Sequence, residues 1–129
     1  MVLHVPLSYF FMWYLSSLHP LNSNLLPKTV DLECMGSWTG SNLTAVKSGN
    51  TVTIYGNGLT NAIANERLSV IPESLIPPYN VQTACSSSKN GENACVSINT
   101  NGEMFIAINN FYDWYTPGAS YSFAVTYVV

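Results

Sequence analysis

From residue 37 to its end, the chain alternates apolar and polar residues. Val52 and Ile54 alternate with Thr51, Thr53 and Tyr55, and the last residues repeat the same pattern. Successive side chains of a strand point to opposite faces, so each run predicts a strand with one buried face. The predicted strands are Asn42–Lys47, Thr51–Tyr55, Val81–Ser86, Ala94–Thr100, Met104–Asn109 and Tyr121–Val129. Helical periodicity is absent from this region.

Turn-forming residues separate the predicted strands at intervals of roughly ten residues. They are Gly40, Gly49-Asn50, Gly56-Asn57-Gly58, Pro77-Pro78, Asn90-Gly91, Asn101-Gly102 and Pro117-Gly118. Asn101-Gly102 predicts a type I′ hairpin turn, because that turn needs a positive φ at both central residues. Short strands with this spacing predict an all-β fold, an antiparallel β-sandwich of the jelly-roll kind.

The beginning of the chain has a different character. Residues 1–21 are strongly apolar and contain no Lys or Arg, and a short helix could form between Pro6 and Pro20. Polar interruptions make a spanning helix marginal, and the missing positive charge weakens a secretory signal, although anchor and signal both stay open. We expect the segment to pack on the domain or on neighbouring copies. The chain is therefore divided into an apolar segment with a linker, 1–30, and a domain, 31–129.

Charge is scarce along the chain and bears on its partners. Charged residues make up 9% of the sequence and hydrophobic residues 47%, which leaves little charge to keep an isolated monomer soluble. The predicted strand from Met104 is apolar on both faces and needs cover on both sides. Both observations favour a homo-oligomer. The basic residues are too scattered to neutralise nucleic-acid phosphates, which argues against nucleic-acid binding; they are Lys28, Lys47, Arg67 and Lys89.

Four segments resemble, in order and spacing, the C-terminal receptor-binding head domain of bacteriophage tail-fibre and baseplate proteins. Gly49–Tyr55 is similar to the family's early "gn-V-t-l" strand. Ser69–Pro78 resembles its "lP-gyrP" segment, with Ser74-Leu75-Ile76 in place of Gly-Tyr-Arg. Ile98–Ile106 is similar to its "I-t-dG-v-i" hairpin, and Tyr121–Tyr127 resembles its closing strand. The resemblance covers about residues 37 to 129.

The resemblance implies a β-sandwich head that assembles as a homotrimer at the tip of a virion tail. It also implies contact with other virion tail proteins and with a bacterial cell-surface saccharide or protein, after synthesis in the host cytoplasm. Family members usually carry a shaft upstream, whereas this chain has only the apolar segment. Two alternatives stay open: a purely structural assembly module, and a membrane-tethered or secreted carbohydrate-binding module.

The acidic and basic side chains give no pattern typical of catalysis. Seven carboxylates are spread singly along the sequence, and no His lies in the predicted domain, so hydrolase and nucleophile arrangements are not indicated. No Gly-rich phosphate loop and no metal-spaced Cys/His cluster is present in the sequence. We therefore expect a protein that is not an enzyme and that needs no cofactor or metal.

The segment 109–118 combines aromatic and amide residues with one acid in a predicted loop. Aromatic rings stack on the apolar face of a sugar while amides and carboxylates bind its hydroxyls, so this composition suits a saccharide. The alternative is that Trp114 and Phe111 close the end of the sandwich or an interface. The candidate ligand-binding residues are Asn110, Tyr112, Asp113, Trp114 and Tyr115.

Three cysteines are too few for a disulfide scaffold. Cys85 and Cys95 flank a polar loop, so a hairpin would bring them close enough for a possible bridge, which would leave Cys34 unpaired. Trp38, near the start of the domain, is expected to anchor the core or an interface.

Overall fold

The computed structural model describes residues 26–61, 66–89, 92–110 and 119–129. Within these ranges the chain forms nine strands and one short 3₁₀ helix, and every strand pair is antiparallel. The elements are β1 (Lys28–Asp31), β2 (Trp38–Thr39), β3 (Leu43–Ser48), β4 (Thr51–Asn61), β5 (Arg67–Val70), η1 (Glu73–Leu75), β6 (Val81–Ser87), β7 (Glu92–Ile98), β8 (Glu103–Asn110) and β9 (Ser120–Val128). The predicted all-β antiparallel fold is confirmed.

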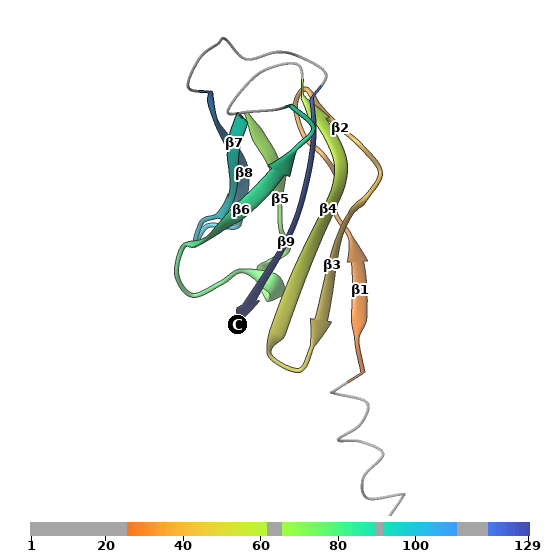
Figure 1. Ribbon diagram of the computed structural model, residues 1–129. Helices are drawn as coiled ribbons and strands as arrows, with labels where there is room; N and C mark the ends of the chain where they lie inside the picture. The colour runs from red at the N-terminus through yellow and green to blue at the C-terminus, as the bar shows by residue number, and fades with distance from the viewer. Residues whose placement is uncertain (1–25, 62–65, 90–91, 111–118) are drawn as a thin grey trace, which may run out of the picture.

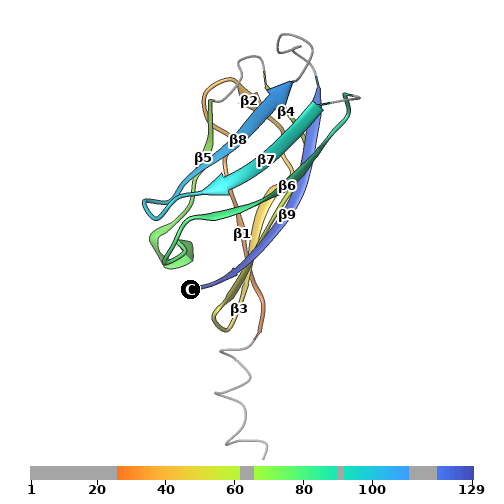
Figure 2. The same cartoon turned by 60° about the vertical axis from the view of Figure 1, so that its left-hand side comes forward.

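The strands form one strongly curled sheet whose two halves face each other across the core (Figures 1 and 2). Their order is β1-β3-β4-β9-β6-β7-β8-β5, and β2 pairs with β4 off this path. β6 joins the halves, because Val81–Cys85 pair with β7 whereas Ser86 and Ser87 pair with β9. The two layers of the predicted sandwich are therefore continuous through a single strand.

Alternation along β4 and β9 builds the centre of the core. Val52 lies opposite Tyr127 and Ile54 opposite Val125, and all four side chains are buried. Trp38 is buried against this layer, which confirms its expected place in the core. From the other half of the sheet, inward side chains of β7 and β8 complete the apolar interior; they are Val96, Ile98, Met104 and Ile106.

β4 continues past the point where the sequence predicted a turn. The glycines of Gly56-Asn57-Gly58 predict a turn, but the strand runs on to Asn61 because a bulge between Gly56 and Leu59 absorbs the irregularity. Gly56 is buried, and a Cβ there would lie 2.4 Å from Cε1 of Phe123. The glycine therefore serves close packing inside a strand rather than a chain reversal.

The hairpin between β7 and β8 is confirmed, but its turn lies one residue earlier than predicted. Gly102 N–H donates to Asn99 O at 2.9 Å, so Thr100 and Asn101 are the central residues of the turn. Gly102 follows at φ 85°, in the left-handed region. This turn, with a left-handed glycine after it, replaces the expected type I′ turn. Both kinds of turn match the right-handed twist of the strands.

Three short strands were not predicted, because each is stabilised by its neighbour rather than by its own pattern. β1 falls in the stretch interpreted as a linker, and only Val30 among its residues is even partly buried. β2 has two residues, and β5 pairs with β8 across an irregular register. Such segments carry too few alternating residues to give a signal.

The two predicted neighbours Cys85 and Cys95 point to opposite faces of the sheet. Cys85 lies opposite Ala94 and Cys95 opposite Ala84, so adjacent pairs of the ladder separate the two thiols. The possible bridge is not formed, and Cys34, Cys85 and Cys95 are all free thiols. Burial raises the pKa of the Cys85 thiol to about 11, so this thiol is protonated at neutral pH.

The apolar segment, in which a short helix could form, lies within residues 1–25 and so outside the described residues. Among the residues that are described, no helix has the length and apolar character needed to cross a membrane.

Candidate functional site

The loop that carries the candidate ligand-binding residues starts and ends at one end of the domain. β8 ends at Asn110 and β9 begins at Ser120, beside the start of β7 (Figure 1). The opposite end holds the start of β1 and the C-terminal Val129, whose N–H donates to Asn50 O at 2.8 Å. We call the first of these the loop end.

The structure fixes the base of the candidate loop. Tyr112, Asp113, Trp114 and Tyr115 lie outside the described residues, and Asn110 is the last residue of β8. Their role in binding therefore stays a prediction, and the residues that hold the two ends of the loop can be described.

A buried carboxylate lies beneath these strand ends. Glu92, the first residue of β7, is 9% exposed. Its Oε1 accepts hydrogen bonds from the phenol of Tyr121 and, at 2.8 Å, from Ser87 Oγ. Its Oε2 is buried and has no hydrogen-bond partner among the described residues. One carboxylate thus joins the ends of β6, β7 and β9.

Two serines tie the end of β6 to the start of β9. Ser88 N–H donates to Ser120 O, and Ser120 N–H donates to Ser88 Oγ, both at 2.9 Å. Lys89 N–H donates to Ser87 Oγ at 3.1 Å, just after the end of β6. Because Ser120 lies two residues after the candidate loop, these bonds fix the start of the strand that follows it.

Trp38 and Glu66 support the same end from the other half of the sheet. The ring of Trp38 meets that of Tyr121 edge to face, with the centroids 5.7 Å apart, and its Nε1–H donates to Glu66 O at 2.9 Å. The Ser37 hydroxyl, and less strongly its N–H at 2.9 Å, donate to Glu66 Oε2 and lower the pKa of that carboxyl. An edge-to-face ring contact and hydrogen bonds thus connect β2, β9 and the residue before β5 at this end.

The outward side of the β1-β3-β4-β9 layer forms a second candidate surface, which we call the outer sheet face. Its residues are Thr29, Asp31, Thr44, Val46, Ser48, Thr51, Thr53, Tyr55, Ala124, Thr126 and Val128. Asp31, on the edge strand β1, is its one charged member. Tyr55 and Val128 are 49% and 55% exposed. This face thus presents uncharged, partly apolar area to its surroundings.

Glu92 shows what the sequence could not reveal. In the sequence it is one of seven scattered carboxylates, beside a predicted turn. Only the pairing of three strands brings Tyr121 and Ser87 to it. Among the described residues no group of His, Cys, Asp and Glu side chains could hold a metal ion. The groups collected at the loop end can orient a loop and accept hydrogen bonds.

This curled antiparallel sheet is the fold of the receptor-binding head domains of phages that infect Listeria and lactococci. The receptor-binding protein gp15 of Listeria phage PSA matches with a TM-score of 0.60 and 13% identity, over 96% of this chain and 88% of that chain. The head domain of lactococcal phage bIL170 matches with a TM-score of 0.60 and 14% identity, over 79% of this chain and 97% of that chain. The resemblance inferred from the sequence is confirmed at the level of the fold.

Sequence comparison finds no match: no protein-family model and no curated protein resembles the chain closely enough to be significant.

Proposed function

We propose that this protein is the receptor-binding head of a phage tail, without enzymatic activity, and that it assembles as a homotrimer on the virion. The observation that carries the proposal is the shared fold, which extends over almost the whole of the bIL170 head domain. The scarcity of charge and the exposed uncharged face support assembly. Its partners would be two further copies, other tail proteins and a molecule of the bacterial surface.

The proposed ligand is a cell-surface saccharide bound by the segment 109–118. Its aromatic and amide side chains suit stacking on a sugar ring and bonding to hydroxyls. The Glu92 network links β6, β7 and β9, and β9 is the strand that follows the segment. A binding loop held at both ends loses less conformational freedom when the ligand binds, which favours affinity.

Binding to host-cell glycans tests the ligand proposal. The full chain and its Trp114→Ala variant are applied to a bacterial glycan array, with Tyr79→Ala as control, because Tyr79 is an aromatic residue 62% exposed outside the loop. We expect Trp114→Ala to lose about ten-fold or more in affinity and Tyr79→Ala to bind as the wild type does. Equal binding by all three proteins would contradict the loop's role.

The outer sheet face is the surface proposed to contact a neighbouring copy. A three-fold assembly joins two different patches of each subunit, and the uncharged face would serve as one of them. Burying it desolvates no charge apart from Asp31 at its edge. Thr53 and Thr126 form a hydrogen-bonded pair across the centre of this face at 2.9 Å.

Sedimentation of the full chain tests the assembly. We expect a mass of three chains for the wild type at micromolar concentration and a shift to monomer for Tyr55→Lys, since a lysine there would be desolvated at the interface. Tyr79→Lys introduces the same charge on another exposed tyrosine and should leave the trimer intact. A monomeric wild type would overturn the trimer without touching the fold assignment.

A purely structural tail module is the second candidate, and the outer sheet face is the observation that favours it. This module would trimerise and hold neighbouring proteins but bind no glycan. It predicts that Tyr55→Lys abolishes incorporation into virions while Trp114→Ala changes neither incorporation nor host adsorption. Loss of adsorption with intact trimers in Trp114→Ala supports the receptor-binding head instead. For the membrane-tethered or secreted alternative, fractionation of cells expressing the chain is the corresponding test.

A further inference from the structure

Two lysines lie directly opposite each other at the end of the domain remote from the loop end, where β8 ends and β9 begins. Lys28 on β1 pairs with Lys47 on β3, and directly paired residues lie on the same face of a sheet. This is the face of Ala45, which points into the core, so both lysines point inward at the mouth of the sandwich. Like charges directly opposite each other destabilise a sheet. The pair therefore calls for a compensating role.

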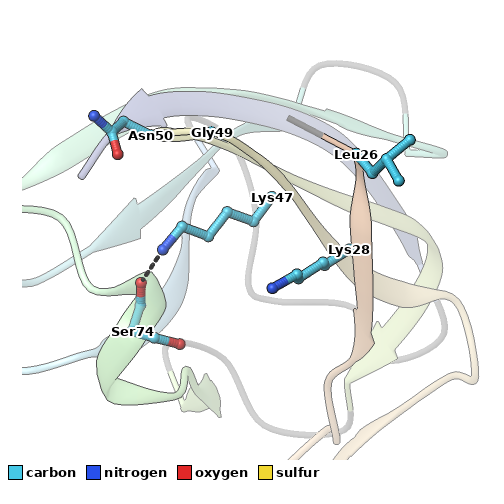
Figure 3. A pocket seen from close by; sticks show the side chains of 6 residues that line it. All are labelled: Leu26, Lys28, Lys47, Gly49, Asn50 and Ser74. Carbon is cyan, nitrogen blue, oxygen red and sulfur yellow. Dashed lines mark hydrogen bonds between the residues drawn. The ribbon is translucent and has the colours of Figure 1, made fainter. Parts of the chain in front are cut away.

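The two side chains border a pocket of about 380 Å³ (Figure 3). Its lining residues are Leu26, Lys28, Lys47, Gly49, Asn50 and Ser74. Lys47 Nζ donates to Ser74 O at 3.3 Å, and no acidic side chain is among the lining residues. Neither lysine forms an ion pair within the described part of the chain. Two ammonium groups thus face one space in which the described residues supply no carboxylate to balance them.

We propose that this pocket binds a phosphate group, as the free anion or as an ester. A phosphate carries nearly two negative charges, which the two ammonium groups would balance. Lysine binds phosphate as a point charge, whereas planar carboxylates favour the fork of arginine. Ser74, Asn50 and Leu26 also line the pocket. The volume leaves room for an organic group beyond the phosphate.

Protection of a sheet edge does not account for the pair. Inward-pointing charges on edge strands prevent unwanted pairing, and β1 is an edge strand, so this role would explain Lys28 alone. Lys47 lies on β3, which is paired on both sides by β1 and β4. An interior strand needs no such protection.

Titration of the full chain, followed by the amide resonances of Gly49, Asn50 and Ser74, tests the pocket at constant ionic strength. The probes are inorganic phosphate, glycerol 1-phosphate and acetate. We expect saturable shifts with both phosphates and at least about ten-fold weaker binding of acetate. If glycerol 1-phosphate binds more tightly than inorganic phosphate, the site is assigned to phosphate esters. If inorganic phosphate binds as tightly or more tightly, the site is assigned to the free anion. No saturable shift, or equal binding of acetate, would overturn the proposal.

Charge-removing variants link the binding to the two lysines. Lys28→Gln and Lys47→Gln should each weaken phosphate binding about ten-fold, while Lys28→Arg and Lys89→Gln should retain it. The Gln variants should melt at or above the wild-type temperature, because one charge of a repelling pair is gone. Unchanged phosphate binding in both Gln variants would reject the site. The test is independent of the candidate loop, because β8 ends and β9 begins at the other end of the domain, so either proposal can fail alone.

Discussion

Tyr121 donates its phenolic hydrogen to Oε1 of Glu92, a residue 29 positions earlier in the chain. Both side chains are buried, and Ser87 donates to the same oxygen. The bond connects the first residue of β7 with the second residue of β9, the strand that follows the candidate loop. A buried carboxylate needs such partners. Leaving it without them costs more folding free energy than the hydrogen bonds contribute when they form.

Removing the Tyr121 hydroxyl should therefore destabilise the domain markedly. In Tyr121→Phe the ring still packs on Trp38, but Glu92 loses a donor inside the core. We expect the free energy of unfolding to fall by about 1.5–3 kcal/mol, the usual range for a hydrogen bond to a charged group. Urea unfolding measures the change, with Tyr55→Phe on the exposed face as the matched control, expected to change it by less than about 0.5 kcal/mol. Equal losses in the two variants would show that the Glu92 bond contributes nothing specific.

Tyr127 makes stability sensitive to alkaline pH. Its buried hydroxyl donates to Leu75 O at 2.6 Å, and burial raises its pKa to about 12 from the ordinary value of 10.0. The unfolded chain then releases this proton at lower pH than the folded chain. The stabilising contribution is complete below pH 10 and is lost as the pH rises from about 10 to about 12.

Tyr127→Phe isolates this effect. The variant should lose about 1 kcal/mol at neutral pH, because Leu75 O loses its donor. The difference in unfolding free energy between wild type and variant should then shrink above pH 10, since the variant has no proton to release at this position. Urea unfolding at several pH values gives the difference directly. A difference that stays constant through this range would contradict the assignment.

Gly102 should tolerate no side chain. It adopts φ 85°, and a Cβ there would lie 3.0 Å from Ile76 Cδ1 and 3.2 Å from Ile71 O. Gly58 offers a matched control, because it also has a positive φ, 65°, but open space around the added Cβ. Gly58→Ala should cost about 1–2 kcal/mol from backbone conformation alone, and Gly102→Ala should cost more. Thermal unfolding that ranks the two variants equally would show that the contacts at Gly102 relax freely.

Strand pattern was recoverable from the sequence wherever a strand contributes its own alternating apolar residues. β4 and β9 carry such runs, β8 carries a continuous apolar run, and all three were predicted. β1 could not be predicted, because its formation depends on pairing with β3 and not on its own hydrophobic residues. The turn at Asn99 shifted by one residue for a related reason: Ile71 N–H donates to Gly102 O at 2.9 Å and so docks the hairpin onto a distant segment.

Composition and short-range pattern by themselves determined the all-β class, the positions of the main strands along the chain and the charge-poor character of this protein, because these depend on residues close in sequence. Only the tertiary structure decided that Cys85 and Cys95 face apart, that Glu92 meets Tyr121, and that Lys28 and Lys47 share one pocket. Each of these depends on the register between strands. Register is set by how the whole core packs, and a shift of one residue would turn every side chain to the opposite face.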